Sequence, residues 1–188
     1  RGEPAPRGGA GMTAGLLEGR VVLVAGAGAG LGRQVACAAA RAGAAVVVSG
    51  RTAGGANAET VATIEDAGGR AVDVAADVTS ADDVQRLVDA AVERYGGLDG
   101  LVYGAFHPGG MSVPAVDADL ATWQACFDVN LFGALRVVQA AAPALRRSEA
   151  GSVVLVGSQT GRRVRPGRWA HTVAPGAPEI GNPVGVAF

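Results

Sequence analysis

The residues best suited to chemistry stand in a glycine-rich turn that follows an apolar segment. The apolar residues 21–25 run directly into Gly26, and two further glycines follow at Gly30 and Gly32, where a helix-forming run of small residues begins. A buried parallel strand that enters a helix through such a turn binds dinucleotide pyrophosphates, because glycines let the backbone approach the phosphates and the helix N-terminus holds the anion. A glycine-rich bend without a ligand is the alternative that this turn alone leaves open.

The end of the second apolar segment bears on which dinucleotide fits. An acidic side chain at that point would accept hydrogen bonds from the ribose hydroxyls of an adenosine. The chain has Ser49-Gly50-Arg51-Thr52 there instead, without a carboxylate. Arg51 can form two hydrogen bonds to a 2′-phosphate, so the sequence favours NADP, with NAD as the alternative. Arg51 as a plain solvated loop residue is the other interpretation.

A carboxylate follows the third apolar segment at Asp77. It lies where the carboxyl end of a strand would meet the same crevice, and it could accept a hydrogen bond from an adenine amino group. A plain loop carboxylate is an equal alternative. The adenine contact of Asp77 is therefore a hypothesis.

The elements that must position these residues alternate along the chain. Strands are expected at 21–25, 44–49, 70–75, 98–104 and 152–157, with helices at 30–42, 57–67, 81–95 and 120–147. This alternation predicts an α/β doubly wound parallel sheet, a Rossmann fold, with strand order 3-2-1-4-5 and its crevice beside the first strand. The segment after residue 160 has no clear periodicity, so the last strands of such a fold are expected to be lacking.

Composition limits the class of protein. The 188 residues suffice for one domain: we expect a disordered extension at 1–15, a dinucleotide-binding domain at 16–160 and an irregular tail at 161–188. A net charge of −1 argues against nucleic acid as a partner. The two cysteines have neither disulfide nor metal spacing, which suggests the cytoplasm. No apolar run reaches the length of a membrane span, since Arg41 interrupts the best candidate, so no membrane is expected.

Several motifs together resemble the short-chain dehydrogenase/reductase family over about residues 17–161. These are Gly26-x-x-x-Gly30-x-Gly32, Ala76-Asp77-Val78, Asp128-Val129-Asn130 and the segment around Ser158. The resemblance implies hydride transfer between a nicotinamide cofactor and an alcohol or ketone, with a homo-oligomer as the intact form. It assigns Ser158 to substrate orientation and Asn130 to a structural and proton-relay role. The cofactor-binding residues are expected to be Gly26, Gly30, Leu31, Gly32, Arg51, Asp77, Val78 and Ala105.

The proton-handling residues of that family are missing from their expected positions. A tyrosine is expected thirteen residues after Ser158 and a lysine four residues later; His171 and Pro175 stand there, and the chain contains no lysine. His171 is a weak candidate for proton transfer, and a loop histidine is the better interpretation. The sequence therefore suggests a C-terminally truncated or frame-shifted member. The alternatives are a catalytically inactive nucleotide-binding protein and an interaction fragment, and no substrate class can be read from the residues.

Overall fold

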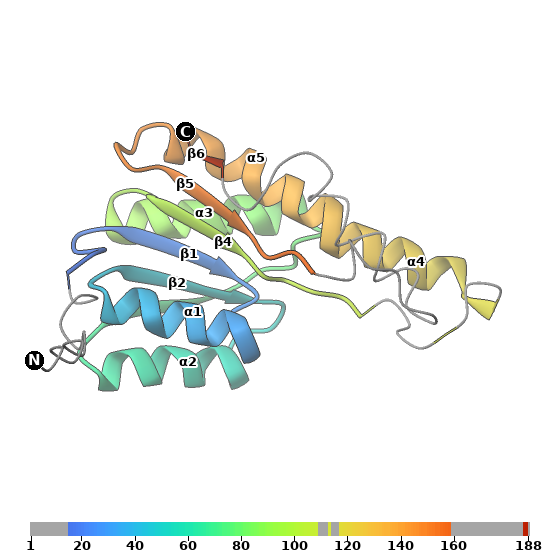
Figure 1. The fold of residues 1–188 in the computed structure, drawn as a ribbon, viewed down its shortest axis with the longest axis horizontal. Coiled ribbons are helices and arrows are strands. Elements are labelled where there is room, and N and C mark those ends of the chain that lie inside the picture. Colours follow the sequence, from blue (N-terminus) through green and yellow to red (C-terminus); the bar gives the residue numbers. More distant parts are fainter. Residues whose placement is uncertain (1–14, 109–112, 114–116, 159–185, 188) are drawn as a thin grey trace, which may run out of the picture.

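A parallel sheet forms the centre of the protein. The structure is a computed structural model that describes residues 15–108, 113, 117–158 and 186–187. The strands lie in the order β3-β2-β1-β4-β5-β6, and Figure 1 shows β2, β1, β4 and β5 side by side. The parallel strands are β1 (Val21–Ala25), β2 (Ala45–Gly50), β3 (Arg70–Ala75), β4 (Gly100–Tyr103) and β5 (Ser152–Leu155). The predicted fold class and the order 3-2-1-4-5 are confirmed.

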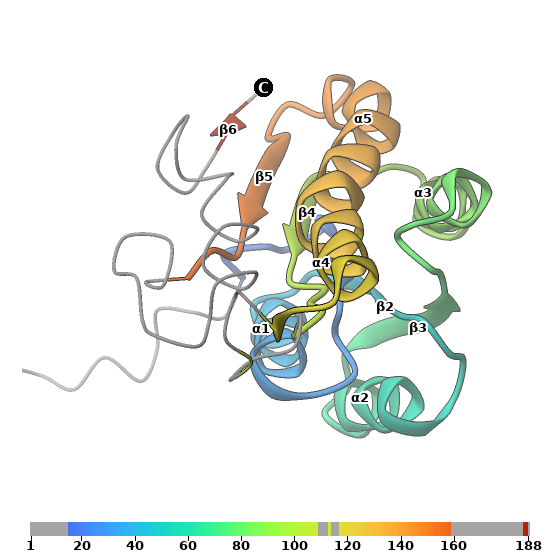
Figure 2. The same cartoon turned by 90° about the vertical axis from the view of Figure 1, so that its right-hand side faces the viewer.

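Helices cover both faces of this sheet (Figure 1 and Figure 2). One face is covered by α1 (Gly30–Arg41) and α2 (Gly55–Asp66), and the other by α3 (Ala81–Tyr95) and α5 (Ala134–Leu145). Every residue of β1 is buried, as are the first five residues of β2. Continuous Val and Ala runs suit these two strands because helices leave neither face of the sheet to water.

The register of the strands brings three carboxyl ends to one edge. Ala25 at the end of β1 lies opposite Ser49 of β2 on one side and Tyr103 of β4 on the other. Loops that leave these three strands therefore begin within a few ångströms of one another. In an open parallel sheet, the crevice at this edge is where ligands bind.

The long helical region expected at 120–147 is divided into three parts. α4 (Leu120–Phe127) leads into a π-helical turn (Asp128–Gly133), which continues as α5. Pro143 lies inside α5, and the helix runs past it to Leu145. The whole run Leu120–Leu145 has the length and hydropathy of a membrane span, so the expectation that no segment reaches that length is wrong. Buried helices of soluble proteins meet the same criterion, and one side of α5, with Val137 and Ala141, is buried in the core.

A short strand at the end of the chain was not expected from its pattern. β6 (Val186–Ala187) pairs antiparallel with β5, with Val186 opposite Val153 and Ala187 opposite Ser152. A two-residue strand has too few residues for alternation to be recognised, which is why the sequence pattern predicts only an irregular segment there.

At the amino ends of the strands, Asp99 precedes β4 and accepts hydrogen bonds from three other residues. Its carboxylate accepts hydrogen bonds from the Val21 amide (2.8 Å), the Ser148 hydroxyl (2.5 Å) and the Arg20 guanidinium (3.3 Å). Partial burial raises the pKa of Asp99, but these hydrogen bonds outweigh it and hold the pKa below its ordinary value of 3.8. Asp99 therefore stabilises the fold in its ionised form.

Replacing Asp99 with alanine is expected to lower the free energy of unfolding at pH 7 by about 2 kcal/mol, because it leaves the Val21 amide and the Ser148 hydroxyl without their acceptor. The pKa of Asp99 is lower in the folded protein than in the unfolded chain, so the ionised carboxylate stabilises the fold above its ordinary pKa, and this contribution is lost as pH falls below it. Urea unfolding of both proteins between pH 7 and pH 3 tests this. A difference that stays constant over that range would contradict it.

Candidate functional site

The glycine-rich turn after β1 lies directly against the start of the loop after β4. Gly26 has φ +86°, and a Cβ at this position would lie 2.6 Å from the backbone nitrogen of Ala105. The amides of Gly26 and Ala27 both donate to the carbonyl of Ser49, at 2.8 and 2.9 Å. Only glycine allows this conformation and this approach together. The turn is thereby fixed to both neighbouring strands.

The other two glycines of the motif form the start of α1. A Cβ at Gly32 would lie 2.0 Å from the carbonyl oxygen of Gly26, so the helix packs onto the turn without room for a side chain. Gly30 has φ +58°, and a Cβ there would meet open space. Ala29 caps α1 without a side-chain hydrogen bond, and Leu31 is exposed. No side chain caps the first amides of the helix, so they are available to an anion, and the expected binding of a cofactor by Gly30, Leu31 and Gly32 stays a prediction.

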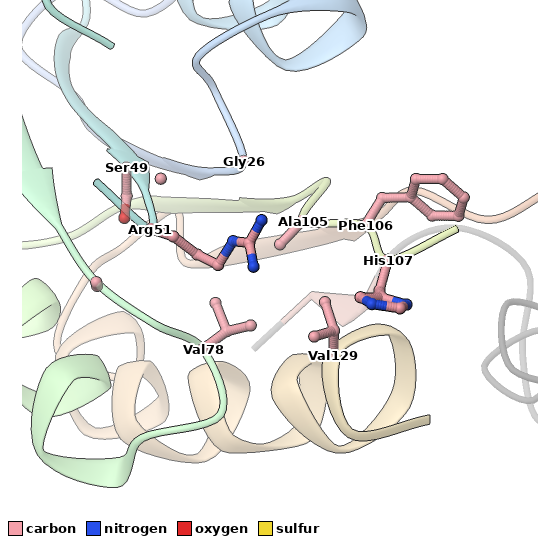
Figure 3. Close-up of a pocket in the computed structure, with 10 residues that line it drawn as sticks. Gly26, Ser49, Arg51, Val78, Ala105, Phe106, His107 and Val129 are labelled. Carbon is pink, nitrogen blue, oxygen red and sulfur yellow. The ribbon is translucent and has the colours of Figure 1, made fainter. Parts of the chain in front are cut away.

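A pocket opens beside this turn, at the carboxyl edge of the sheet (Figure 3). The Arg51 side chain reaches into it, between Ala105 on one side and Val78 on the other (Figure 3). Within the described part of the chain, the Arg51 guanidinium makes no hydrogen bond or ion pair. The lining residues come from four of the expected strand ends and the π-helical turn: Gly26, Ser49, Gly50, Arg51, Ala76, Val78, Ala105, Phe106, His107 and Val129.

The structure places Asp77 in a local turn and not among the residues that line this pocket. Its carboxylate accepts hydrogen bonds from the amide (2.9 Å) and the hydroxyl (2.7 Å) of Thr79. Its own amide donates to Asp83, which belongs to the capped start of α3. The adjacent Val78 does line the pocket. The expected contact between Asp77 and an adenine stays a prediction.

Asn130 fixes the loop that leaves β4. Its side chain is buried in the π-helical turn, where Oδ1 accepts from the His107 amide (2.8 Å) and Nδ2 donates to the His107 carbonyl (3.0 Å). Nδ2 also lies 3.2 Å from Cys126 Sγ, and burial raises the pKa of that thiol. π-helical turns are frequent at functional sites, and this one aims Asn130 at the loop. The structural part of its expected role therefore has a clear geometry, while proton relay stays a prediction.

Tyr103 lies between the sheet and the π-helical turn. It is the last residue of β4, is almost fully buried, and donates its hydroxyl proton to the Val129 carbonyl at 2.5 Å. Burial raises the pKa of Tyr103 far above its ordinary value of 10.0. The hydroxyl therefore joins β4 to the π-helical turn as a neutral donor. Tyr103 is not among the residues that line the pocket.

Replacing Tyr103 with phenylalanine is expected to lower the free energy of unfolding by about 1 kcal/mol, since the partly buried Val129 carbonyl loses the hydrogen bond from the Tyr103 hydroxyl. The folded-state pKa lies above the unfolded one, so the parent protein loses stability as pH rises above about 10, where only the unfolded chain releases the proton. The variant lacks this group. Thermal unfolding between pH 8 and pH 11 should therefore show that the difference in Tm between the parent protein and the variant becomes smaller at high pH. A difference in Tm that becomes larger would contradict this expectation.

The remaining expected catalytic residues are only partly placed. Ser158 is half-buried and follows β5, whose continuation is fixed by a 2.9 Å hydrogen bond from the Val156 amide to the Tyr103 carbonyl. It thus lies at the carboxyl end of the strands, as the pocket does, but is not among the residues that line the pocket. His171 and Pro175 lie outside the described residues. Among the residues that are described, no group of His, Cys, Asp or Glu could hold a metal ion.

Three polar residues beside the site were not expected from the sequence. Asn57 and Thr60 on α2 are buried, and Thr60 donates to the Ala27 carbonyl of the glycine-rich turn at 3.0 Å. Asp73 on β3 accepts hydrogen bonds from the loop that carries Arg51 and from Asn57. The position of its carboxylate between two apolar residues, Val72 and Val74, is the one signal in the sequence that could have singled out Asp73.

Comparison with known proteins agrees with this geometry. A family model described as short chain dehydrogenase matches residues 20–174. The 7alpha-hydroxysteroid dehydrogenase of Escherichia coli K12 is 33% identical over 142 residues, which are 76% of this chain and 54% of that protein. An L-rhamnose 1-dehydrogenase (NAD(P)(+)) from a Sphingomonas species is 39% identical over 148 residues, covering 76% of this chain and 56% of the relative.

Solved structures show the same fold with cofactor bound. A 7 alpha-hydroxysteroid dehydrogenase complexed with NADH and 7-oxo glycochenodeoxycholic acid is 29% identical, with a TM-score of 0.80 over 86% of this chain and 62% of that one. A structure described as a short chain dehydrogenase from Escherichia coli CFT073, complexed with NADPH, is 32% identical, with a TM-score of 0.81 over 88% and 69%. The chain spans about half the length of the curated relatives it matches. It belongs to the short-chain dehydrogenase family.

Proposed function

We propose that this chain binds NADP(H) in the pocket at the carboxyl edge of the sheet, as part of an oxidoreductase that acts on an alcohol or a ketone. The observation that carries the proposal is the guanidinium of Arg51 inside the pocket, beside Gly50 where an acidic side chain would favour NAD. An unpaired guanidinium can bind a 2′-phosphate through two parallel hydrogen bonds.

The described residues suit the separate parts of such a cofactor. The amides at the start of α1 and the glycine-rich turn would hold the pyrophosphate, and Arg51 the 2′-phosphate. Val78, Ala105 and Val129 offer an apolar surface to a flat ring, and Asp77 is the candidate for the adenine amino group. Relatives that accept NAD(P)(+) or were solved with NADPH support this choice, and a relative solved with NADH keeps NAD as the alternative.

When bound, the nicotinamide supplies the hydride chemistry. We propose that Ser158 orients the substrate oxygen and that Asn130 holds the loop beside it, in line with the family resemblance. The residues that the family resemblance requires for proton transfer are missing. His171 and Pro175 occupy the positions at which the resemblance requires tyrosine and lysine, and Tyr103 is held neutral by burial. The second candidate function is therefore a nucleotide-binding protein without efficient turnover.

Nucleotide titration tests the first candidate. We expect NADPH to bind about tenfold more tightly than NADH, measured by the change in nicotinamide fluorescence, and Arg51→Ala to remove this difference. Arg41→Ala is the matched control, because Arg41 is exposed at the far end of α1. Equal binding of the two nucleotides to the parent protein would refute the choice of NADP, and no binding at all would favour an interaction fragment.

A hydride-transfer assay on the same protein separates the two candidates. With NADP and secondary alcohols we expect turnover near the detection limit, because His171 and Pro175 stand where the resemblance requires tyrosine and lysine. Robust turnover would show that His171, His107 or another group performs this step. The assay therefore decides between an oxidoreductase and a nucleotide-binding protein.

Partners and compartment follow from the same proposal. The exposed apolar side chains of Leu120, Phe132 and Leu135 suit self-association in the intact family form. Cys37 and Cys126 are both buried and neither forms a disulfide within the described residues, which suits the reducing cytoplasm. Neither nucleic acid nor a membrane is a proposed partner, and the substrate is defined no further than an alcohol or ketone.

A further inference from the structure

The loop that carries Arg51 is held by side chains outside the pocket. β2 ends at Gly50 and α2 begins at Gly55, so Arg51 lies on the short connection between them. Its guanidinium has no partner within the described residues, so its own contacts do not fix its position. The position of Arg51 must therefore be set by the backbone of this connection.

Asp73 supplies the first anchor. It lies on β3, the edge strand of the sheet, and points to the α2 side, since Val72 and Val74 pack into the core on the opposite face. Its Oδ2 accepts a hydrogen bond from the Gly54 amide at 2.8 Å. Gly54 is the N-cap of α2, with φ +76°. The carboxylate thus caps the helix from a neighbouring strand, where a negative charge is favoured by the helix dipole.

Asn57 supplies the second anchor. It is 4% exposed, and its Nδ2 donates both to Asp73 Oδ1 (2.9 Å) and to the Thr52 carbonyl (3.3 Å). Its Oδ1 faces the two strand ends: a Cβ on Gly28 or on Gly50 would lie 2.8 Å from this oxygen. Asn57 therefore spans the space between the glycine-rich turn and the connection that carries Arg51.

We propose that Asp73 and Asn57 are positioning residues that set the preference for a phosphorylated adenosine ribose. This inference rests on the proposed binding of NADP(H). Together they fix Thr52 and Gly54, which lie on the C-terminal side of Arg51, while β2 fixes the other side. When the backbone of this connection is already fixed, Arg51 binds the 2′-phosphate without a further loss of conformational entropy. When the connection is mobile, its backbone must become ordered on binding, which costs affinity.

The pyrophosphate site does not depend on Asp73 in the same way. The glycine-rich turn is held by the Ser49 carbonyl and by Thr60, and neither contact involves Asp73. Removing Asp73 should therefore lower the affinity for the 2′-phosphate and leave the rest of the adenosine site unchanged. This difference separates a positioning role from a general structural role.

Calorimetric titration with 2′,5′-ADP and with 5′-AMP tests the proposal on the full chain. Asp73→Ala is expected to weaken 2′,5′-ADP about tenfold, the loss typical of a charge-assisted hydrogen bond, and to change 5′-AMP no more than about twofold. Asp73→Asn retains one acceptor and should show a smaller loss in the same direction. Asp66→Ala is the matched control, since it removes a carboxylate from the opposite, exposed end of α2.

The outcomes are separable. If Arg51→Ala removes the preference for 2′,5′-ADP and neither Asp73 variant reduces it, the positioning role is overturned while the proposed cofactor stands. An equal loss for both nucleotides on Asp73→Ala also overturns it, because that is the result of a general structural defect. If the parent protein does not prefer 2′,5′-ADP, the proposed choice of NADP fails, and the inference with it. Should Asp73→Ala not fold, as judged by thermal unfolding, Asp73→Asn carries the same comparison.

Discussion

Gly32→Ala is expected to abolish nucleotide binding and to lower the free energy of unfolding by about 3 kcal/mol or more. The added Cβ would lie 2.0 Å from the carbonyl oxygen of Gly26 and 3.1 Å from the Cα of Ala27. Both atoms belong to the backbone, so no side chain can rotate away. Either α1 must move off the turn or the turn must move off β1. In both cases the amides that would hold a pyrophosphate lose their common direction.

Gly30→Ala separates the effect on the ligand from the effect on the fold. Its Cβ would meet open space, so the only structural cost is the left-handed conformation at φ +58°, about 1 kcal/mol. The free space beside Gly30 is where a phosphate would lie. We therefore expect a loss of NADPH affinity with little loss of stability.

Gly97→Ala is the control for these two variants, since Gly97 lies outside the turn and its Cβ would also meet nothing. Urea unfolding and NADPH titration are measured on all three proteins. If Gly32→Ala were as stable as Gly97→Ala, the close packing of α1 on the turn would be refuted.

The central strands could be predicted from the sequence because nearly every residue in them is buried and therefore apolar. β1 is buried along its whole length and most of β2 is buried too, so each reads as an unbroken apolar run. β1 and β3 have the expected bounds, and β2 is shifted by one residue. The glycine spacing located the turn, whereas the positive φ of Gly26 and Gly30 is known only from the structure, since glycine permits either sign of φ.

The start of α2 could not be predicted, because its cap comes from another strand. Periodicity places the helix at 57–67, whereas it begins at Gly55. The Gly54 amide finds its acceptor on Asp73, nineteen residues further along the chain. A cap on a neighbouring residue would leave a recognisable spacing, but a cap supplied through the tertiary fold leaves none.

The π-helical turn is a second feature that a single sequence does not reveal. An extra residue within one helical turn changes which side chains share a face, but Asp128–Gly133 still reads as part of one helical run. The resemblance identifies Asn130 as a site residue without saying what it holds. Its partner is the backbone of His107, which has no side-chain signature, so this contact is visible only in the folded protein.

Asn130→Ala is accordingly expected to lower the free energy of unfolding by about 3 kcal/mol and to weaken NADPH binding about tenfold. The substitution removes the Asn130 acceptor from the partly buried His107 amide and the Asn130 donor from its carbonyl, and each such loss costs about 1–3 kcal/mol. The loop after β4 lines the pocket with Ala105, Phe106 and His107. Without Asn130 this loop is more mobile, so it must become ordered when a nucleotide binds, and the entropy lost lowers the affinity.

Hydrogen exchange reports on the contact directly, because the His107 amide is one of the bonded groups. We expect its protection to be lost in Asn130→Ala. In Asn130→Asp it should be retained in part, since that variant keeps the acceptor for the amide but replaces the donor to the carbonyl. Gln124→Ala, which removes an exposed amide side chain from α4, should leave exchange, stability and NADPH affinity unchanged. Unaltered protection of His107 in Asn130→Ala would mean that other contacts hold the loop, and the coupling between the π-helical turn and the pocket would then be refuted.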